Sequence, residues 1–368
     1  MLLTADPLWQ LTAACADDMR PERLDLIVGV YRDDSGASPV MRAVRAAELR
    51  LAQRSPSKAY AGPSGNPRFA ALLTDLLLAG ADLSSRTVAV QSVAGTGALR
   101  LLAELLATTG PDRTVHLGTP SYVNHAGILA AAGLRVATHP VQDMLAAVET
   151  ARPGDALVIQ GCCHNPSGFS MPIRQWDLLS AALVRRGVVP FIDQAYFGLG
   201  DGLDADLAGM RRLLRAVPFG VVAVSGSKAW GLYSERVGAA LVVGELPGAR
   251  GLLEGIARTS YSQPPAHGAM IVEEILGDPE LTACWRSELE AMRRRLGRLR
   301  TGLASRLGDM PGLPEQRGMF LSLPLTAGAM ERLRVEHGIY GLPSGRINLA
   351  GLPESRIPEV ADAIRQVV

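Results

Sequence analysis

The stretch VAVSGSKAWGLYSERVGAALVV, Val222–Val243, decides the fold. It begins and ends with apolar runs that predict two buried strands, and Lys228 and Arg236 lie in the polar span between them. A lysine at the end of a buried strand is desolvated, which lowers the pKa of its amine and makes it a candidate nucleophile. The alternative is a surface turn that carries two solvated cations.

Similar apolar runs recur along the chain, with helix-like stretches between several of them. Most are nearly continuous, which is typical of strands buried on both faces of a mainly parallel sheet. The alternation with helical patterns predicts an α/β layered domain. The runs are 87–93, 115–118, 156–161, 188–193, 220–225 and 239–244.

The pattern changes after Gly277. A long amphipathic stretch begins at Asp278–Pro279, a pair suited to the start of a helix. Short strand-like and helix-like segments follow, which predict a smaller α+β domain. We expect an N-terminal arm with part of the small domain at 1–38, a large domain at 39–285, and the rest of the small domain at 286–368.

The composition of the chain indicates which kinds of partner and which cell compartment to expect. The formal net charge is +1 with both signs interspersed, so we expect no nucleic-acid partner and no membrane partner. The N-terminus lacks the pattern of a signal peptide, and no apolar run reaches membrane-spanning length. The four cysteines show no metal-ligand spacing, and we expect a cytoplasmic protein with reduced thiols and no metal.

Chemically useful side chains follow the predicted strands, where open α/β sheets bind ligands. Gly95 and Thr96 lead directly into a helix, whose N-terminal amides and dipole favour a phosphate. Each candidate taken alone is equally explained as a turn or a structural residue. Together they would suit pyridoxal phosphate, which needs a lysine and an acidic partner for its ring nitrogen. The remaining candidates are Tyr122, Asn165, Asp193 and Tyr196.

The motifs make a family resemblance apparent. The chain resembles the fold-type I pyridoxal-phosphate-dependent aminotransferases, in the class I aspartate/aromatic amino acid group, almost from end to end. This resemblance implies a three-layer α/β/α fold with a mainly parallel sheet, a smaller α+β domain, and a homodimer with composite active sites. The shared stretches include KAYAGPSGNPRF, GTPSYVNH, CCHNPSG, DQAYFGLGDGLDAD, SGSKAWGLYSERVG and SGRINLAGL.

The resemblance also implies roles around the coenzyme ring. Lys228 would form the Schiff base and shuttle the substrate proton. Asp193 would pair with the pyridinium nitrogen, and Tyr122 would lie over the ring. Tyr196 and Asn165 would hydrogen-bond the phenolic oxygen.

Phosphate binding is implied for a second set of residues, one of which would reach over from the partner subunit. That residue is Tyr60. The others, from the same chain as the lysine, are Gly95, Thr96, Ser225, Ser227 and Arg236.

Substrate recognition is implied for a third set. Arg346 would bind the α-carboxylate through a planar two-point contact that lysine cannot make. Arg258 would bind a distal carboxylate across the dimer interface. Gly29 and Val30 would line the side-chain pocket together with Asn165.

Three positions depart from the family pattern. Tyr122 stands where tryptophan is usual, Ala94 where serine begins the phosphate loop, and Gln160 where histidine is common. The residues that carry the chemistry remain, so these changes bear on the identity of the substrate.

The leading hypothesis is a ping-pong aminotransferase that moves the amino group of an acidic or aromatic L-amino acid to a 2-oxo acid, with 2-oxoglutarate as the expected acceptor. The alternative is another pyridoxal phosphate reaction on the same scaffold: β- or γ-elimination, a synthase step or amino acid oxidation. A non-catalytic domain of a transcriptional regulator is disfavoured, since no basic recognition helix precedes the predicted helix at 45–52.

Overall fold

The computed structural model describes residues 7–308, 310 and 312–368. The chain divides into two compact units. The larger unit comprises 40–162 and 171–290, and the smaller unit comprises the described part of 1–39 together with 163–170 and 291–368. The segment 163–170 groups with the smaller unit because its backbone bonds there: the Arg317 amide donates to the Gly168 carbonyl at 2.6 Å.

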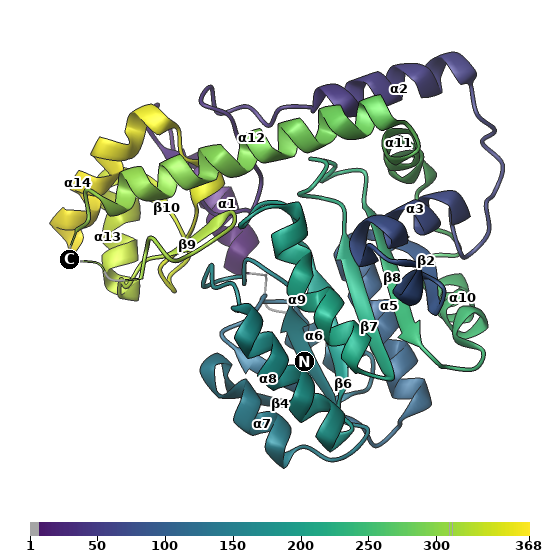
Figure 1. Ribbon diagram of the computed structural model, residues 1–368. Coiled ribbons are helices and arrows are strands. Elements are labelled where there is room, and N and C mark those ends of the chain that lie inside the picture. Colours follow the sequence, from purple (N-terminus) through teal and green to yellow (C-terminus); the bar gives the residue numbers. More distant parts are fainter. Residues whose placement is uncertain (1–6, 309, 311) are drawn as a thin grey trace. The chain divides into compact units, whose positions relative to one another are not determined.

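A seven-stranded sheet organises the larger unit (Figure 1). Its strand order is β2-β8-β7-β6-β5-β3-β4, and β8 alone runs antiparallel to its neighbours. The expectation of a mainly parallel α/β sheet is therefore confirmed. The strands are β2 (Thr87–Val93), β3 (Thr114–Thr119), β4 (Arg135–Pro140), β5 (Ala156–Gln160), β6 (Val189–Gln194), β7 (Phe219–Ser225) and β8 (Val237–Gly244).

Helices cover both faces of this sheet, with α8 and α9 on one face and α5 on the other (Figure 1). The layer between α5 and the sheet is filled by buried aliphatic side chains such as Leu102, Leu106 and Val242. The helices are α2 (Arg42–Arg54), α3 (Pro67–Leu78), α4 (Ala81–Ser84), α5 (Ala94–Thr109), α6 (His125–Ala131), α7 (Met144–Thr150), α8 (Ile173–Arg186), α9 (Leu203–Ala216), α10 (Ala249–Ser260) and α11 (Ala266–Leu276).

The smaller unit is an α+β fold around its own core, which includes Leu299, Leu321 and Ile364. Two short sheets organise it: β1 pairs with β10 in parallel, and β9 pairs with β11 antiparallel. The boundary between the units falls inside α12 (Pro279–Ala304). The other elements are α1 (Pro7–Asp17), β1 (Leu24–Asp25), β9 (Phe320–Ser322), α13 (Ala327–His337), β10 (Ile339–Tyr340), β11 (Arg346–Asn348) and α14 (Ile357–Val367).

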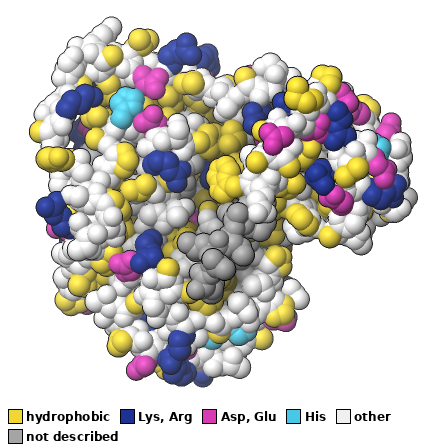
Figure 2. All heavy atoms as spheres, turned by 180° about the vertical axis from the view of Figure 1, so that it is seen from behind, with side chains coloured by type: hydrophobic (Ala, Val, Ile, Leu, Met, Phe, Trp, Pro, Cys, Tyr) yellow, Lys and Arg dark blue, Asp and Glu magenta, His cyan; other side chains and the backbone are white. Residues whose placement is uncertain are grey.

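Two surface properties bear on partners. Within the described part of the chain, no helix combines the length and the apolar character needed to cross a membrane. On the face drawn in Figure 2, lysine and arginine side chains are scattered among aspartate and glutamate side chains.

Candidate active site

The predicted coenzyme residues of the larger unit gather at one edge of its sheet. Asp193 is near the end of β6, and Lys228 follows three residues after β7. The loop after β3 carries Tyr122, and α5 begins directly after β2 with Ala94. This edge is where an α/β sheet of this topology binds ligands, because strand ends and helix N-termini converge there.

Lys228 is the candidate nucleophile of this group. Its side chain is half-buried, and its Nζ lies 5.4 Å from the centroid of the Tyr196 ring. Burial lowers the pKa of the Lys228 amine to about 8; Asp193 opposes this shift, and the Arg236 charge adds to it. A substantial fraction of the amine is therefore neutral near physiological pH, as a nucleophile requires.

Asp193 is fixed by a histidine at the start of α6. The His125 Nε2 and the Asp193 Oδ2 lie 2.9 Å apart, and both side chains are buried. On its other side, the His125 Nδ1 lies 2.8 Å from the Ser121 hydroxyl. Burying a carboxylate is costly without such a partner, so this hydrogen-bonded chain fixes where the Asp193 oxygens point.

Tyr122 packs at right angles against this histidine. The two ring centroids are 5.3 Å apart, and the planes meet at 88°. The Tyr122 hydroxyl accepts a hydrogen bond from the Asn124 side chain at 2.9 Å. The ring predicted to lie over the coenzyme is thus held by its contact with His125 and through its hydroxyl.

The start of α5 forms a cradle suited to an anion. Gly95 lies so close to Ser225 that an added Cβ would stand 2.9 Å from the serine Cβ. Ser225 and Ser227 are both buried, and the Ser227 amide donates to the Ser225 hydroxyl oxygen at 3.4 Å. Thr96, in the first turn of the helix, is exposed. These hydroxyl groups and the helix N-terminus are the donors a phosphate would use.

Arg236 completes the cationic side of this edge. It immediately precedes β8, and its side chain is half-buried. Its Nη1 donates to the Tyr233 carbonyl at 2.8 Å, which orients the guanidinium.

Two predicted site residues of the larger unit lie at the surface instead. Tyr60 is 92% exposed, and Arg258 is exposed at the end of α10, where it donates to the Ser262 hydroxyl. Gln263 anchors the loop of Tyr60, because its side-chain oxygen accepts from the Ala61 amide at 2.8 Å.

In the smaller unit, Arg346 is buried among oriented partners. Its Nη1 donates to the Asn165 Oδ1 at 3.1 Å and its Nη2 to the Ile27 carbonyl at 2.7 Å. The guanidinium carbon lies 4.3 Å from the centroid of the Phe320 ring. This geometry gives a rigid, planar cation of the kind that binds a carboxylate at two points.

The structure brings one residue into the site that the sequence reasoning did not assign. His125 is the first residue of α6 and was not among the predicted site residues. Its partner Asp193 is 68 residues away in the chain, so no local spacing connects the two. The available signal was its position three residues after Tyr122.

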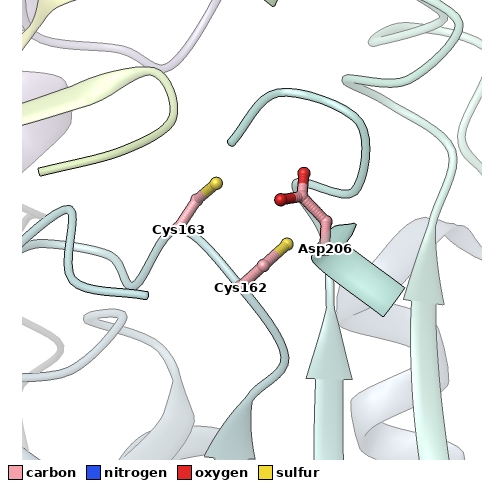
Figure 3. Close-up of side chains that lie close together, drawn as sticks. All are labelled: Cys162, Cys163 and Asp206. Carbon is pink, nitrogen blue, oxygen red and sulfur yellow. The ribbon is translucent and has the colours of Figure 1, made fainter. Parts of the chain in front are cut away.

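A separate cluster lies between the end of β5 and the start of α9 (Figure 3). The Cys162 thiol and an Asp206 carboxylate oxygen lie within 4.8 Å, and Cys163 follows directly in the chain. The Asp206 oxygens accept hydrogen bonds from backbone amides at 2.8 to 2.9 Å, which ties the preceding loop to α9. The donors are Gly198, Gly200 and Asp201. We read this aspartate as a structural group of the loop.

The donor set of the larger unit fits pyridoxal phosphate. An amine of lowered pKa, a buried carboxylate with a fixed orientation, and an anion cradle occur together at one sheet edge. Pyridoxal phosphate requires these same three groups for its aldehyde, its ring nitrogen and its phosphate.

Comparisons with known proteins agree with this chemistry. The family model described as aminotransferase class I and II matches residues 21–364. A tyrosine aminotransferase of Rhizobium meliloti (strain 1021) is 45% identical over 97% of this chain and 96% of its own length. An aspartate aminotransferase of Salmonella typhi is 36% identical over 99% of this chain and 98% of its own.

Solved structures give the same result. An aromatic amino acid aminotransferase with 3-indolepropionic acid has a TM-score of 0.93 at 39% identity, covering 99% of this chain and 98% of that one. An aromatic-amino-acid aminotransferase from Burkholderia pseudomallei, covalently bound to pyridoxal phosphate, has a TM-score of 0.94 at 36% identity. That match covers 100% of this chain and 98% of the other.

Proposed function

The chain belongs to the class I and II aminotransferase family, and we propose that its preferred amino donors are aromatic L-amino acids, with 2-oxoglutarate as the acceptor. Amino-acid transamination and the use of pyridoxal phosphate follow from the family and from the named relatives. The aromatic preference is supported by one observation: the tyrosine aminotransferase is more similar to this chain than the aspartate aminotransferase.

Lys228 is the proposed proton carrier. The bound coenzyme supplies an aldehyde carbon and an electron-accepting ring. The Lys228 Nζ would bind at that carbon in the resting enzyme and, once displaced by substrate, would move a proton to or from the substrate Cα. Its lowered pKa supports this role, because a neutral amine accepts a proton where an ammonium cannot.

Asp193 would hold a proton at the ring nitrogen. Its carboxylate is fixed by His125, so its negative charge stays in place during the reaction. Tyr196 would hydrogen-bond the phenolic oxygen, and Tyr122 would lie over the ring. Gly95, Thr96, Ser225, Ser227 and Arg236 would bind the phosphate.

The smaller unit would bind the substrate. Arg346 would bind the α-carboxylate, and this role is supported by the fixed plane of its guanidinium. Asn165 would contact both the substrate and the coenzyme, and Gly29 and Val30 would line the pocket for the substrate side chain.

We propose a homodimer in which Tyr60 and Arg258 act in the partner's active site. Their exposure in the single chain supports this, because a phosphate ligand and a carboxylate ligand would otherwise be left in solvent. We also propose a cytoplasmic location, which is supported by the lack of a disulfide bond among the four cysteines, all of them in the described part of the chain.

A substrate screen of the purified holoenzyme tests the function. Each of the common amino acids is supplied with 2-oxoglutarate, and glutamate formation is measured. We expect tyrosine and phenylalanine to give the highest kcat/KM. A higher value for aspartate would overturn the aromatic preference. The relatives do not favour elimination, synthase or oxidase chemistry. Release of ammonia without formation of glutamate would instead support one of these reactions.

A further inference from the structure

Two side chains of β11 share one face and contact the same segment of chain. Arg346 and Asn348 are two residues apart on this strand, so their side chains point the same way. The Arg346 guanidinium binds the Ile27 carbonyl, and Asn348 binds the carbonyls of Val28 and Val30. The segment 27–30 thus bonds directly to the strand that carries the proposed carboxylate ligand.

Asn348 makes the larger share of this attachment. Its side chain is fully buried, and its Nδ2 donates to the Val28 and Val30 carbonyls, both at 2.8 Å. Its backbone amide donates to the Leu26 carbonyl at 2.7 Å. Both hydrogens of one amide group are therefore used to fix one short turn.

The turn is tight and fits closely against an aromatic ring. The Val30 amide donates to the Val28 carbonyl at 2.7 Å, which closes a turn centred on Gly29. A Cβ on Gly29 would stand 2.7 Å from the Phe320 Cζ. The same Phe320 ring packs on the Arg346 guanidinium, so a shift of the turn would disturb the packing around Arg346.

We propose that Asn348 is a positioning residue of the substrate site: it holds the Val28–Val30 turn so that Val30 and Arg346 keep their arrangement toward the substrate. It acts through the turn and touches no reacting atom. This inference rests on the proposed function, in which Arg346 and Val30 contact the substrate.

The test compares the holoenzyme with its Asn348→Asp variant. Aspartate keeps the shape of the side chain but donates no hydrogen bond, and the oxygen that replaces Nδ2 would face the Val28 and Val30 carbonyl oxygens. We expect KM for tyrosine and 2-oxoglutarate to rise roughly tenfold with a smaller change in kcat. The Kd of 3-indolepropionic acid should rise by a similar factor, while coenzyme content and absorbance stay as in the wild type.

Tyr340→Phe is the matched control. It removes a partly buried hydrogen bond of the same unit, from the Tyr340 hydroxyl to the Asp18 Oδ2 at 2.8 Å, and leaves the Asn348 hydrogen bonds to the turn in place. We expect its KM values and its Kd to match the wild type. Equal losses in both variants would overturn the inference, because they would indicate general loosening of the unit.

The experiment distinguishes failure of the positioning role from failure of the proposed function. A folded Asn348→Asp variant with wild-type KM and Kd overturns the positioning role and leaves transamination intact. A wild-type enzyme that fails to transaminate overturns the proposed function instead. If Asn348→Asp does not fold, Gly29→Ala tests the same turn, since its Cβ must displace Phe320; wild-type KM there also overturns the inference.

Discussion

The backbone amide of Ala94 donates to the carbonyl oxygen of Arg236 at 2.9 Å, and both residues have left-handed backbones. Their φ angles are 53° and 52°, values that non-glycine residues adopt at a cost. The bond joins the first residue of α5 to the residue before β8, at the proposed phosphate cradle. Strained backbone is retained where the surrounding structure requires it, often at functional sites.

Ala94→Val is expected to weaken coenzyme binding. A β-branched residue in the left-handed region costs about 1–2 kcal/mol. If the backbone of the phosphate cradle shifts to relieve this strain, the Kd for the coenzyme should rise by roughly tenfold. Ala94→Gly is the control at the same position, because glycine adopts this conformation freely. Titration of each apoenzyme variant with pyridoxal phosphate measures its Kd for the coenzyme. Equal affinities would show that the conformation does not matter for binding.

The rate of coenzyme addition to the apoenzyme is expected to follow the neutral fraction of the Lys228 amine. Its pKa is lowered to about 8 by burial, so the neutral fraction rises as pH increases toward 8 and is nearly complete above 9. The rate should therefore climb between pH 6 and 9 and then level off, as followed by absorbance after stopped-flow mixing. A rate still rising tenfold per unit between pH 9 and 10 would indicate an unperturbed lysine.

Strands with buried residues were predictable, whereas a strand without buried residues and distant pairs were not. The run 220–225 predicted β7 to within one residue, because its continuous apolar pattern reflects burial. The strand β4 was missed, since none of its residues RVATHP is buried and the apolar pattern of a strand is therefore lacking. The pairing of His125 with Asp193 needs the folded sheet, whereas Lys228 follows from its place directly after a buried strand.

His125→Phe is expected to lower both stability and turnover. Phenylalanine fills the space but leaves the buried Asp193 carboxylate without its imidazole partner, at a cost of about 3 kcal/mol in the free energy of unfolding. We expect kcat to fall by roughly a hundredfold, because the carboxylate would no longer be held toward the ring nitrogen. Ser121→Ala, which removes only the outer hydroxyl, should retain most activity. Denaturant unfolding and steady-state kinetics separate the two effects; a similar loss in both variants would contradict the specific role of the imidazole.

Arg346→Lys is expected to reduce kcat/KM by roughly a hundredfold for every amino acid tested. Lysine keeps the charge but loses the planar pair of donors, and it cannot hold the Asn165 and Ile27 contacts together. Arg332→Lys, an exposed change in the same unit, should leave kinetics unaltered. The assignment is wrong if the Arg346 variant loses activity with aspartate but not with tyrosine, since the α-carboxylate is common to both.

Arg258→Gln is expected to lower the activity toward acidic substrates alone. Loss of a charged hydrogen bond to a distal carboxylate should lower kcat/KM for aspartate and 2-oxoglutarate by roughly 10- to 100-fold, and leave the half-reaction with phenylalanine unchanged. Arg250→Gln, an exposed change at the other end of α10, controls for charge. Parallel losses for aspartate and phenylalanine would assign the effect to folding rather than recognition.

A mixed dimer tests whether Arg258 acts in the active site of the partner subunit. Lys228→Ala chains lack the amine, and Arg258→Gln chains lack the distal ligand. If the active sites are composite, a dimer of one chain of each kind contains one site with both Lys228 and the partner's Arg258, because each comes from the chain that retains it. Aspartate activity should then return on mixing under conditions that exchange subunits. No recovery, with exchange verified by mass, would place Arg258 and Lys228 in the same chain's site, because the only chain with the amine would then lack the arginine.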